Sequence, residues 1–322
     1  MQKGLIVLYI SFTFAHLLSA QSAPSNNENI PYLVTFGSDS RTSWGDDDFC
    51  QTFFFIVPSD HTSPIYLRVF DPDISGNLDE AKGVFDTEVN FSIYGGIQAW
   101  SHPDAQGESP KGKYRSGMLL ASKTFKSDEE YNLKYYSFGP FNPSEGEYVE
   151  KFDGRVFKII AEGVSGDDGN LYRYFLSTDP HKNIPVEGAN LFTYKYTFRL
   201  YNDQSQVSQL YPFVDEKTTS IEISNFDWDE DGFIRIISVA KNGILCPVSG
   251  DDNWEKKQFP ITEKERNTTI EIQFIKNQKR KILNNNVVIV VKNQYGQNLP
   301  FFVIPLGGVP VYIPKIRVKE IE

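Results

Sequence analysis

The sequence predicts an all-β protein with two antiparallel β-sandwich domains in tandem, the first jelly-roll-like and the second immunoglobulin-like. Three observations support this fold class. Short runs rich in aromatic and β-branched residues recur along the chain of 322 residues. Clusters of Gly, Pro, Asn and Asp separate these runs, and helical periodicity is nearly absent. Several runs alternate apolar and polar residues, as strands with one buried face do.

The first twenty residues have the features of a secretory signal peptide. Lys3 supplies a positive charge, residues 5–18 are mostly apolar, and Leu18-Ser19-Ala20 offers small residues for cleavage. The apolar run is too short to span a bilayer, and no later run is long enough. We therefore expect residues 1–20 to be a signal peptide. The protein would be exported to the periplasm, the cell surface or the exterior, with no transmembrane segment.

The first sandwich is expected over residues 31–210, after a polar leader at 21–30 that we expect to be disordered. Its predicted strands cover residues 52–58, 65–71, 89–95, 135–141, 155–163, 171–177 and 192–201. In the last strand, aromatic residues alternate with Lys195, Thr197 and Arg199. This alternation predicts one buried face and one solvated face.

A more polar segment, residues 202–218, marks the expected boundary between the domains. The second sandwich is predicted over residues 217–322, about the 100 residues usual for an immunoglobulin-like module. Its predicted strands cover residues 220–224, 233–240, 268–275, 287–293, 301–307 and 311–318.

The net charge of the chain bears on which kinds of molecule it can bind. The formal charge of −10 argues against nucleic acid as a partner, because such binding relies on Lys and Arg. One basic run, residues 276–281, lies between two predicted strands and is expected to be a solvated hairpin loop. Cys50 and Cys246 could pair in an exported protein. They could equally stay as small buried apolar residues, since a chain of this length does not need the bond.

Local catalytic signatures are missing from the sequence. It contains neither the Gly-x-Ser-x-Gly turn of serine hydrolases nor the His-Glu-x-x-His zinc motif. We therefore expect no catalytic residues. A pair of carboxylates for glycoside hydrolysis cannot be recognised from sequence here, because an acidic chain offers many such pairs. A secreted hydrolase acting on polysaccharide or peptide through such a pair stays open as the alternative.

The segment NFDWDEDGFIRI, residues 225–236, carries the clearest metal-binding pattern. Asp227, Asp229 and Asp231 alternate with other residues and precede Gly232. This spacing matches positions 1, 3, 5 and 6 of known calcium loops, where glycine permits a sharp turn. We expect the three aspartates to bind calcium through side-chain oxygens. The following residue would contribute its backbone carbonyl, and that residue is Phe233.

The same loop departs from an EF-hand. Ser238 occupies position 12, where a glutamate would complete the site, and the residues after the glycine predict a strand. The missing ligands must come from elsewhere, and Asp251 and Asp252 are candidates. Trp228 and Glu230 are expected to point outward. The alternative is an Asp-rich hairpin turn without a metal ion.

A Gly-Asp-Asp sequence occurs three times, at residues 45–47, 166–168 and 250–252. Each copy precedes a strand-like run, and one interpretation is that these are simply turns that lead into strands. They could also present carboxylates to a metal ion.

A second acidic stretch follows the predicted strand at 65–71. We expect four of its residues to be metal ligands: Asp71, Asp73, Asp79 and Asp86. Crowded carboxylates repel one another unless a cation neutralises them, and calcium accepts six to eight oxygen ligands. The alternative is a hydrated acidic loop.

Two resemblances add to this interpretation. The stretch GDDDFCQTFFFIVPSDHTSPIYLRVFDPD…FDTEVNFSIYGG, between residues 45 and 96, resembles the start of bacterial pre-peptidase C-terminal-type sandwich domains. Asp-x-Asp-x-Asp-Gly at 227–232 resembles the calcium loops of dockerins, thrombospondin-type repeats and EF-hands. The first resemblance implies a noncatalytic sandwich in secreted proteins, sometimes stabilised by calcium.

The expected function combines these observations. We expect a secreted or cell-envelope bacterial protein that is noncatalytic and binds calcium. It would act as a binding, adhesion or structural module. Its partner would be an extracellular ligand, either a glycan or an envelope protein.

Overall fold

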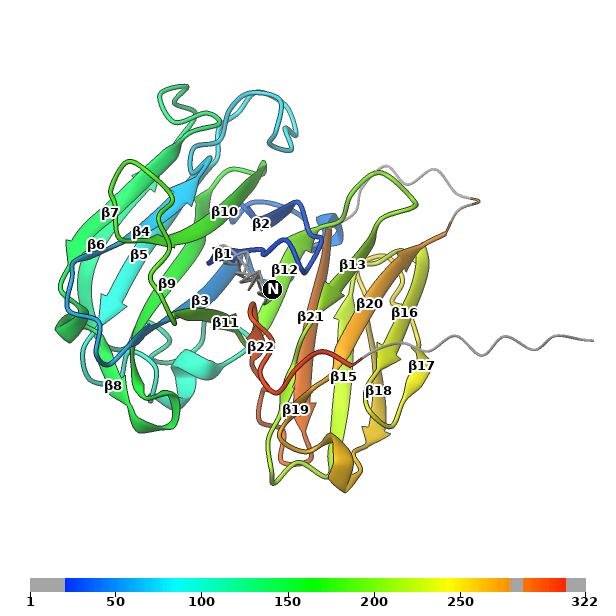
Figure 1. Ribbon diagram of the computed structural model, residues 1–322. Helices are drawn as coiled ribbons and strands as arrows, with labels where there is room; N and C mark the ends of the chain where they lie inside the picture. The colour runs from blue at the N-terminus through cyan, green and yellow to red at the C-terminus, as the bar shows by residue number, and fades with distance from the viewer. Residues whose placement is uncertain (1–20, 278, 280–285, 311–322) are drawn as a thin grey trace, which may run out of the picture.

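A computed structural model describes residues 21–277, 279 and 286–310 of the chain. The described residues form antiparallel sheets joined by turns and short 3-10 helices, which confirms the all-β fold class (Figure 1). The predicted signal peptide, the centre of the basic loop and the predicted strand at 311–318 lie outside the described residues. Within the described part, no helix has the length and apolar character needed to cross a bilayer.

The largest sheet contains nine strands and runs through both halves of the molecule. In spatial order its strands are β18 (Trp254–Pro260), β15 (Ser220–Phe226), β21 (Asn286–Asn293), β12 (Lys195–Arg199), β2 (Tyr32–Phe36), β10 (Gly169–Ser177), β4 (Ile65–Phe70) and β7 (Tyr135–Phe141), with β1 (Ser22–Ala23) beside β10.

A second sheet belongs mainly to the N-terminal half. Its strands in order are β22 (Phe301–Phe302), β11 (Asn190–Thr193), β3 (Cys50–Pro58), β9 (Gly154–Ser165), β5 (Glu88–Gly95) and β6 (Met118–Phe125), with β8 (Glu147–Val149) beside β9. Two smaller sheets lie in the C-terminal half. They comprise β13 (Val207–Leu210), β20 (Glu271–Lys276), β16 (Gly232–Ile237) and β17 (Asn242–Cys246), and the pair β14 (Phe213–Val214) and β19 (Thr268–Thr269).

Five 3-10 helices complete the described elements. They are η1 (Thr42–Trp44), η2 (Pro103–Gln106), η3 (Pro143–Glu145), η4 (Glu150–Phe152) and η5 (Glu263–Glu265).

Two strand pairings tie the halves together. β12 pairs with β21 from Lys195 opposite Val290 to Arg199 opposite Asn286, so the large sheet is continuous across the halves (Figure 1). β22 likewise pairs with β11. β13 falls inside the range 31–210 expected for the first domain, yet it pairs with β20 of the C-terminal half. A short polar strand of this kind is recognised by its long-range partner, not by its composition.

Aromatic side chains fill the interior between the sheets. Phe53 of β3 contacts Tyr174 of β10 edge-on, with ring centroids 5.5 Å apart, and Tyr196 of β12 at 5.3 Å. Such pairs contribute about 0.5–1.5 kcal/mol each beyond their area burial. The same contiguous cluster includes Phe198 of β12 and Phe274 of β20, so one core extends across both halves.

The two faces of β12 differ from the sequence expectation. Tyr196 and Phe198 are buried on one face, but Lys195 and Thr197 are buried as well. Gln51 accepts a hydrogen bond from the Thr197 amide at 2.8 Å and covers part of the polar face. Arg199, at the end of β12, is half-buried, so β12 has no fully solvated face. The alternating residues of β12 give it one apolar buried face and one polar buried face. The polar face is buried because the segment before β3 folds over it.

Residues 21–30 also differ from the expected disordered leader. β1 pairs with β10, and the Gln21 side chain accepts from the Val186 amide at 2.8 Å. Glu28 is fully buried and accepts a hydrogen bond from the Tyr196 hydroxyl at 3.0 Å. The polar composition suggested a solvated segment, but these polar side chains are satisfied by groups distant in the sequence.

Strand prediction succeeded where the apolar signal is strong. Predicted strands coincide within a few residues with β3, β4, β5, β7, β9, β10 and β21. The predicted strand at 192–201 is divided into β11 and β12 at Tyr194. The strands that no prediction covered are β1, β2, β6, β8, β13, β14 and β17. Cys50 and Cys246 are both free and buried.

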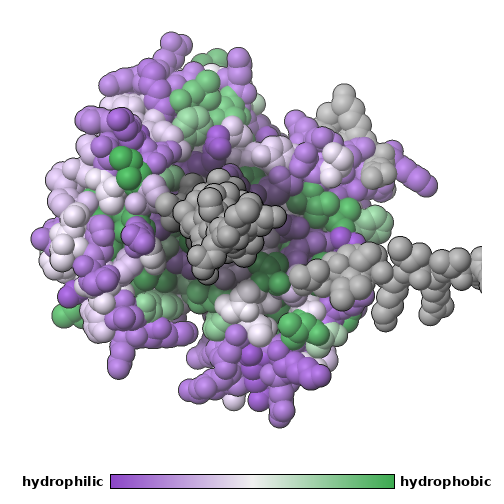
Figure 2. Space-filling view, viewed as in Figure 1, coloured by the Kyte–Doolittle hydropathy of each residue, from purple (hydrophilic) through white to green (hydrophobic). Residues whose placement is uncertain are grey.

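Polar residues dominate the face of the molecule shown in Figure 2, with small apolar patches between them. Isolated apolar residues of this kind are normal on protein surfaces and indicate no function by themselves.

Candidate metal centres

Each of the three Gly-Asp-Asp turns contributes to a group of three carboxylates. In every group the ligand oxygens lie within 4.8 Å of one another, close enough to share a metal ion. The groups are Asp46, Asp47 and Asp48; Asp86, Asp167 and Asp168; and Asp227, Asp229 and Asp251. The turns therefore bring carboxylates together, and the groups differ in what surrounds them.

The first group already contains a positive charge. The Lys195 ammonium forms ion pairs with Asp48 and with Asp47, the latter at 2.9 Å, and all three side chains are at most 15% exposed. Burial would lower the pKa of Lys195, but Asp48, Asp47 and Asp46 outweigh it and raise that pKa above its ordinary value. Lys195 occupies the place that a bound cation would take, so this group is a buried ion-pair cluster.

Burial also shifts the acids of this cluster. It raises the pKa of Asp46 to about 7, although the positive charge of Lys195 opposes the shift. Asp46 accepts hydrogen bonds from the amides of Phe36 at 2.9 Å and Phe49 at 3.0 Å. These bonds hold the Gly-Asp-Asp turn against β2 and orient its carboxylates toward β12.

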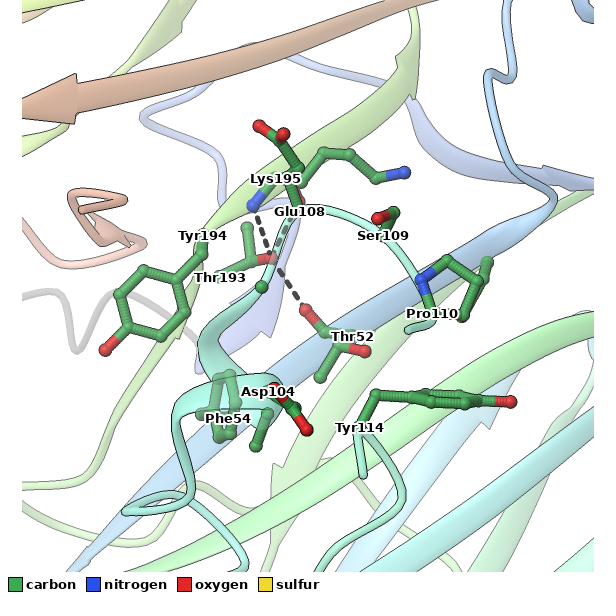
Figure 3. Close-up of a pocket in the computed structure, with 13 residues that line it drawn as sticks. Thr52, Phe54, Asp104, Glu108, Ser109, Pro110, Tyr114, Thr193, Tyr194 and Lys195 are labelled. Atoms are coloured by element: carbon green, nitrogen blue, oxygen red, sulfur yellow. Dashed lines mark hydrogen bonds between the residues drawn. The ribbon is translucent and has the colours of Figure 1, made fainter. Parts of the chain in front are cut away.

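A small cavity lies beside this cluster, between β3, β11 and the loop after η2 (Figure 3). The Thr193 hydroxyl lies 2.6 Å from the carbonyl oxygens of both Thr52 and Lys195, so these two acceptors share its single hydrogen (Figure 3). The cavity measures about 20 Å³. This volume accommodates about one water molecule, so the cavity is too small for an organic ligand.

In the second group, main-chain amides engage the central carboxylate. Asp168 is fully buried and accepts from the amides of Lys82 at 2.8 Å and Asp86 at 3.0 Å. Asp86 is exposed, and it lies with Asp167 and Asp168 instead of with Asp71, Asp73 and Asp79. The loop that carries the predicted acidic ligands is thus divided between two places in the fold.

The third group forms where β15 and β18 meet. These strands pair antiparallel with Phe226 opposite Trp254, so the turn after β15 lies against the turn before β18. The amide of Asp252 donates to Asp227 at 2.6 Å. Asp251, a candidate for the missing ligands, joins Asp227 and Asp229 in the group. Asp231 is not a member of it.

No Lys or Arg of the described residues forms an ion pair with this third group. Burial raises the pKa of Asp227 to about 7, and Asp229, Asp251 and Asp252 add to the shift. Burial, Asp251 and Asp231 raise the pKa of Asp229 to about 6. Holding these carboxylates ionised together therefore costs free energy that a bound cation would recover.

The side chains around this loop do not follow the expected alternation. Trp228, expected to point outward, is only 2% exposed and packs on Phe274 with ring centroids 5.2 Å apart. Glu230 is exposed, as expected. Asp227, Asp229 and Glu230 all have positive φ angles, between 50° and 56°. With left-handed backbone on both sides of it, Trp228 enters the core, and the simple alternation of side chains is lost.

Phe233, predicted to contribute a carbonyl, lies in β16 opposite Ile275 with its side chain 52% exposed. Its role as a ligand stays a prediction.

Asp71, Asp73 and Asp79 lie in the segment after β4 and belong to none of these three groups. All three are at most 8% exposed. Asp79 accepts from the amides of Ser75 at 2.9 Å and Leu171 at 2.8 Å, which anchors the loop to β10. Burial raises the pKa of Asp71 to about 7, and the charge of Asp73 adds to this rise.

Sequence reasoning missed Lys195 as the partner of the first Gly-Asp-Asp turn. The available signal was a lysine within an aromatic run, which reads as a solvated strand residue until the covering segment is known.

Comparison with known proteins does not assign the chain to a family. Neither family models nor curated proteins match the chain. One solved structure with a weak likeness is that of the Macrobrachium rosenbergii nodavirus. The match has 8% identity and a TM-score of 0.16, and it covers 92% of this chain and 97% of that chain. A likeness at this TM-score carries no argument about fold or function.

Proposed function

We propose that the chain is a secreted or cell-envelope, noncatalytic β-sandwich protein that binds calcium and acts as a binding, adhesion or structural module. One observation carries the calcium part: Asp227, Asp229 and Asp251 meet from two turns, without an ion-pair partner among the described residues. The resemblance to pre-peptidase C-terminal-type domains belongs to the same proposal, since it implies a noncatalytic sandwich that calcium can stabilise.

Calcium suits this group because every side-chain ligand on offer is an oxygen. Calcium takes six to eight oxygens at flexible geometry, whereas zinc prefers nitrogen and sulfur. The three carboxylates supply part of the shell. Asp231 and the carbonyl of Phe233 remain the proposed further ligands, with water completing the shell. Asp229 and Asp251 are exposed, so an ion can reach the group from solvent.

A ligand surface is proposed at a hollow of about 490 Å³ beside η2 and the β21–β22 connection. This volume falls in the range of small-molecule sites. Three aromatic side chains line it: Trp100, Tyr194 and Phe213. The Trp100 indole donates to the Tyr194 hydroxyl at 3.0 Å, which fixes its ring. Rings beside amide side chains such as Asn298 provide stacking faces and hydrogen-bond partners of the kind that a glycan uses.

The alternative function, a hydrolase with paired carboxylates, is favoured by one feature of the same region. Asp215 lines the hollow, and Glu216 lines the adjoining one with it. Release of reducing ends from a polysaccharide panel, lost in Asp215→Asn, would support the hydrolase. Binding on a glycan array without hydrolysis, weakened by Trp100→Ala, would support the binding module.

Calcium-dependent unfolding tests the main proposal. Calcium at about 100 times its Kd should raise the free energy of unfolding by about 2.7 kcal/mol per site. We expect a higher Tm for the wild-type chain in calcium than in a chelator, measured by calorimetry. Asp229→Ala should reduce that increase, because it removes a ligand without changing the core.

The matched control is Asp60→Ala, an exposed aspartate in a turn outside all three groups, which should retain the full increase. An Asp229→Ala protein with the same calcium-dependent rise in Tm as the wild type would contradict this site.

A further inference from the structure

Four buried side-chain oxygens near the end of β4 accept no hydrogen bond from any residue that the structure describes. They are Asp71 Oδ2, Asp73 Oδ1, Asn132 Oδ1 and Asn170 Oδ1. Asp71, Asp73 and Asn170 have no exposed surface, and Asn132 is half-buried. A buried polar group without a partner costs about 1–3 kcal/mol. Several such oxygens in one region therefore point to an occupant that satisfies them together.

Chain connectivity and hydrogen bonds bring β10 to the two aspartates. Asp71 directly follows β4, and Asp73 lies two residues further on. The Asn170 amide nitrogen donates to the carbonyl of Pro72 at 2.8 Å, and Pro72 is the residue between the aspartates. This hydrogen bond holds the side-chain amide of Asn170, and with it the amide oxygen, beside the turn that carries the two aspartates.

The 126–134 loop brings the fourth oxygen from the other side. Asn132 lies against Gly76: a Cβ added there would be 2.5 Å from Asn132 Nδ2 and 2.8 Å from its oxygen. The adjacent residue, Leu133, donates its amide to Asp71 Oδ1 at 2.7 Å. Gly76 thus leaves room for the Asn132 amide beside the carboxylates, and its φ of 77° favours glycine as well.

Neither Asp71 nor Asp73 forms an ion pair with a Lys or Arg of the described residues, although two cations lie nearby. Arg173 attracts Asp71 electrostatically, but its guanidinium lies over the rings of Tyr32 at 4.7 Å and Phe70 at 5.0 Å. Lys134 acts on Asp73 in the same way, but its ammonium donates to the Glu130 carbonyl at 2.9 Å. This site therefore differs from the Lys195 cluster, where a lysine ammonium is in direct contact with the acids.

We propose that Asp71, Asp73, Asn132 and Asn170 bind one calcium ion. Two carboxylate and two amide oxygens form a hard, all-oxygen ligand set with two negative charges, which suits calcium. Asp71 Oδ1 and Asp73 Oδ2 already accept hydrogen bonds, so their second oxygens face the ion. Carbonyls or water complete the shell.

Asp79 has a supporting position in this site. Both of its oxygens accept main-chain amides, from Ser75 and Leu171, so it fixes the loop instead of binding the ion. The proposed ion would link the turn after β4 to β10 and to the 126–134 loop. This site shares no residue with the Gly-Asp-Asp groups, so either can fail while the other stands.

Calorimetric titration of the full chain with calcium, after treatment with a chelator, tests the proposal. We expect Asp73→Asn to lose one bound calcium relative to the wild type. Asn132→Ala should weaken that binding step about tenfold or more, as loss of one ligand does. Glu129→Gln is the matched control: it removes an exposed acid of the same loop and should leave titration unchanged. Asp229→Ala should leave this step unchanged too, because it affects the other proposed site.

Stability of Asp73→Asn gives a second readout, independent of counting ions. Without calcium the variant should have a higher Tm than the wild type, because it relieves repulsion from Asp71. With saturating calcium the order should reverse. Hydrogen exchange at residues 71–79 and 126–134 should slow on calcium addition in the wild type and in Asp229→Ala.

Two outcomes would contradict the proposed calcium site. Equal exchange of both segments with and without calcium, together with an unchanged calcium count in Asp73→Asn, would mean that water alone satisfies these oxygens. If Asp73→Asn fails to fold, wild-type titration affinity in Asn132→Ala, whose side chain is half-buried, would overturn the proposal by itself.

Discussion

The Lys195 cluster and the Asp227 group show two ways to accommodate the same local sequence. Both form at a Gly-Asp-Asp turn, and both bring three carboxylates within 4.8 Å of one another. Lys195 pairs with Asp47 and Asp48, whereas no Lys or Arg of the described residues pairs with the Asp227 group. The Gly-Asp-Asp turn therefore concentrates negative charge in both places. Whether a side chain of the protein or a bound ligand neutralises that charge depends on the neighbouring residues.

Position in the large sheet explains this difference. β12 lies inside the sheet between β21 and β2, so its lysine is enclosed beneath the covering turn. β18 is an outer strand of the same sheet. Asp251, in the turn before β18, and Asp229, in the turn after β15, are both exposed. A soluble ion can therefore reach the Asp227 group, while the Lys195 cluster depends on a charge supplied by the fold.

The largest effect is expected from removing the internal cation. Lys195→Met should lower the free energy of unfolding by about 3–5 kcal/mol, because it leaves buried carboxylates uncompensated. Urea unfolding of the variant and the wild type measures this loss. Lys111→Met, at an exposed lysine, is the control and should change stability little. A loss below about 1 kcal/mol in Lys195→Met would show that the Lys195 charge contributes little more to stability than a surface ion pair does.

A smaller effect is expected from pH at the Asp227 group. The pKa of Asp227 is raised from 3.8 to about 7 in the folded chain. The folded state then holds this proton more tightly than the unfolded state, so stability falls as pH rises between these values. We expect a decline of about 1 kcal/mol without calcium, reduced by partial solvation of the loop.

Calcium should remove this decline, since a bound cation favours the ionised carboxylate. Asp227→Asn should flatten the same part of the profile without calcium. The Lys195 cluster supplies the contrast: Asp46 also has a pKa of about 7, but its contribution should persist in calcium. Melting temperatures across pH 4 to 8, with and without calcium, measure both. Identical profiles in the two conditions would remove the distinction between the groups.

The smallest effect is expected at the second Gly-Asp-Asp turn. Asp167 is half-buried, and Asp167→Asn keeps the size and shape of its side chain, so it should change the free energy of unfolding by no more than about 0.5 kcal/mol. Asp168, in contrast, accepts several hydrogen bonds and is fully buried. Chemical denaturation of Asp167→Asn checks this. A loss above about 1 kcal/mol would indicate that all three turns carry structural charge.

Local sequence was sufficient for the fold class and for most strands with a strong apolar signal. β3 and β21 consist largely of buried apolar residues, and both were predicted within two residues. β6 was not predicted, because its residues are largely exposed or half-buried at a sheet edge and show no alternation. Backbone pairing with β5 makes it a strand, and that pairing is invisible in its composition.

Individual side chains show the same limit. Aspartates spaced by two residues predicted a shared centre, yet left-handed backbone at Asp227 and Asp229 turned Trp228 into the core. Asn132 and Asn170 carried no signal at all, since amides at unrelated positions are common in loops and strands. Their partnerless oxygens are recognisable only when burial and hydrogen bonding are known.

Local sequence was therefore enough to locate the strongly apolar strands, the Gly-Asp-Asp turns and the concentrations of negative charge, because these depend on residues close together in the chain. Only the tertiary structure decided which carboxylates meet and what neutralises them. Asp227 reaches Asp251 through the register of β15 against β18, and Lys195 reaches Asp47 across 148 positions of sequence. Such meetings depend on how distant strands pair and pack, which no local pattern of residues encodes.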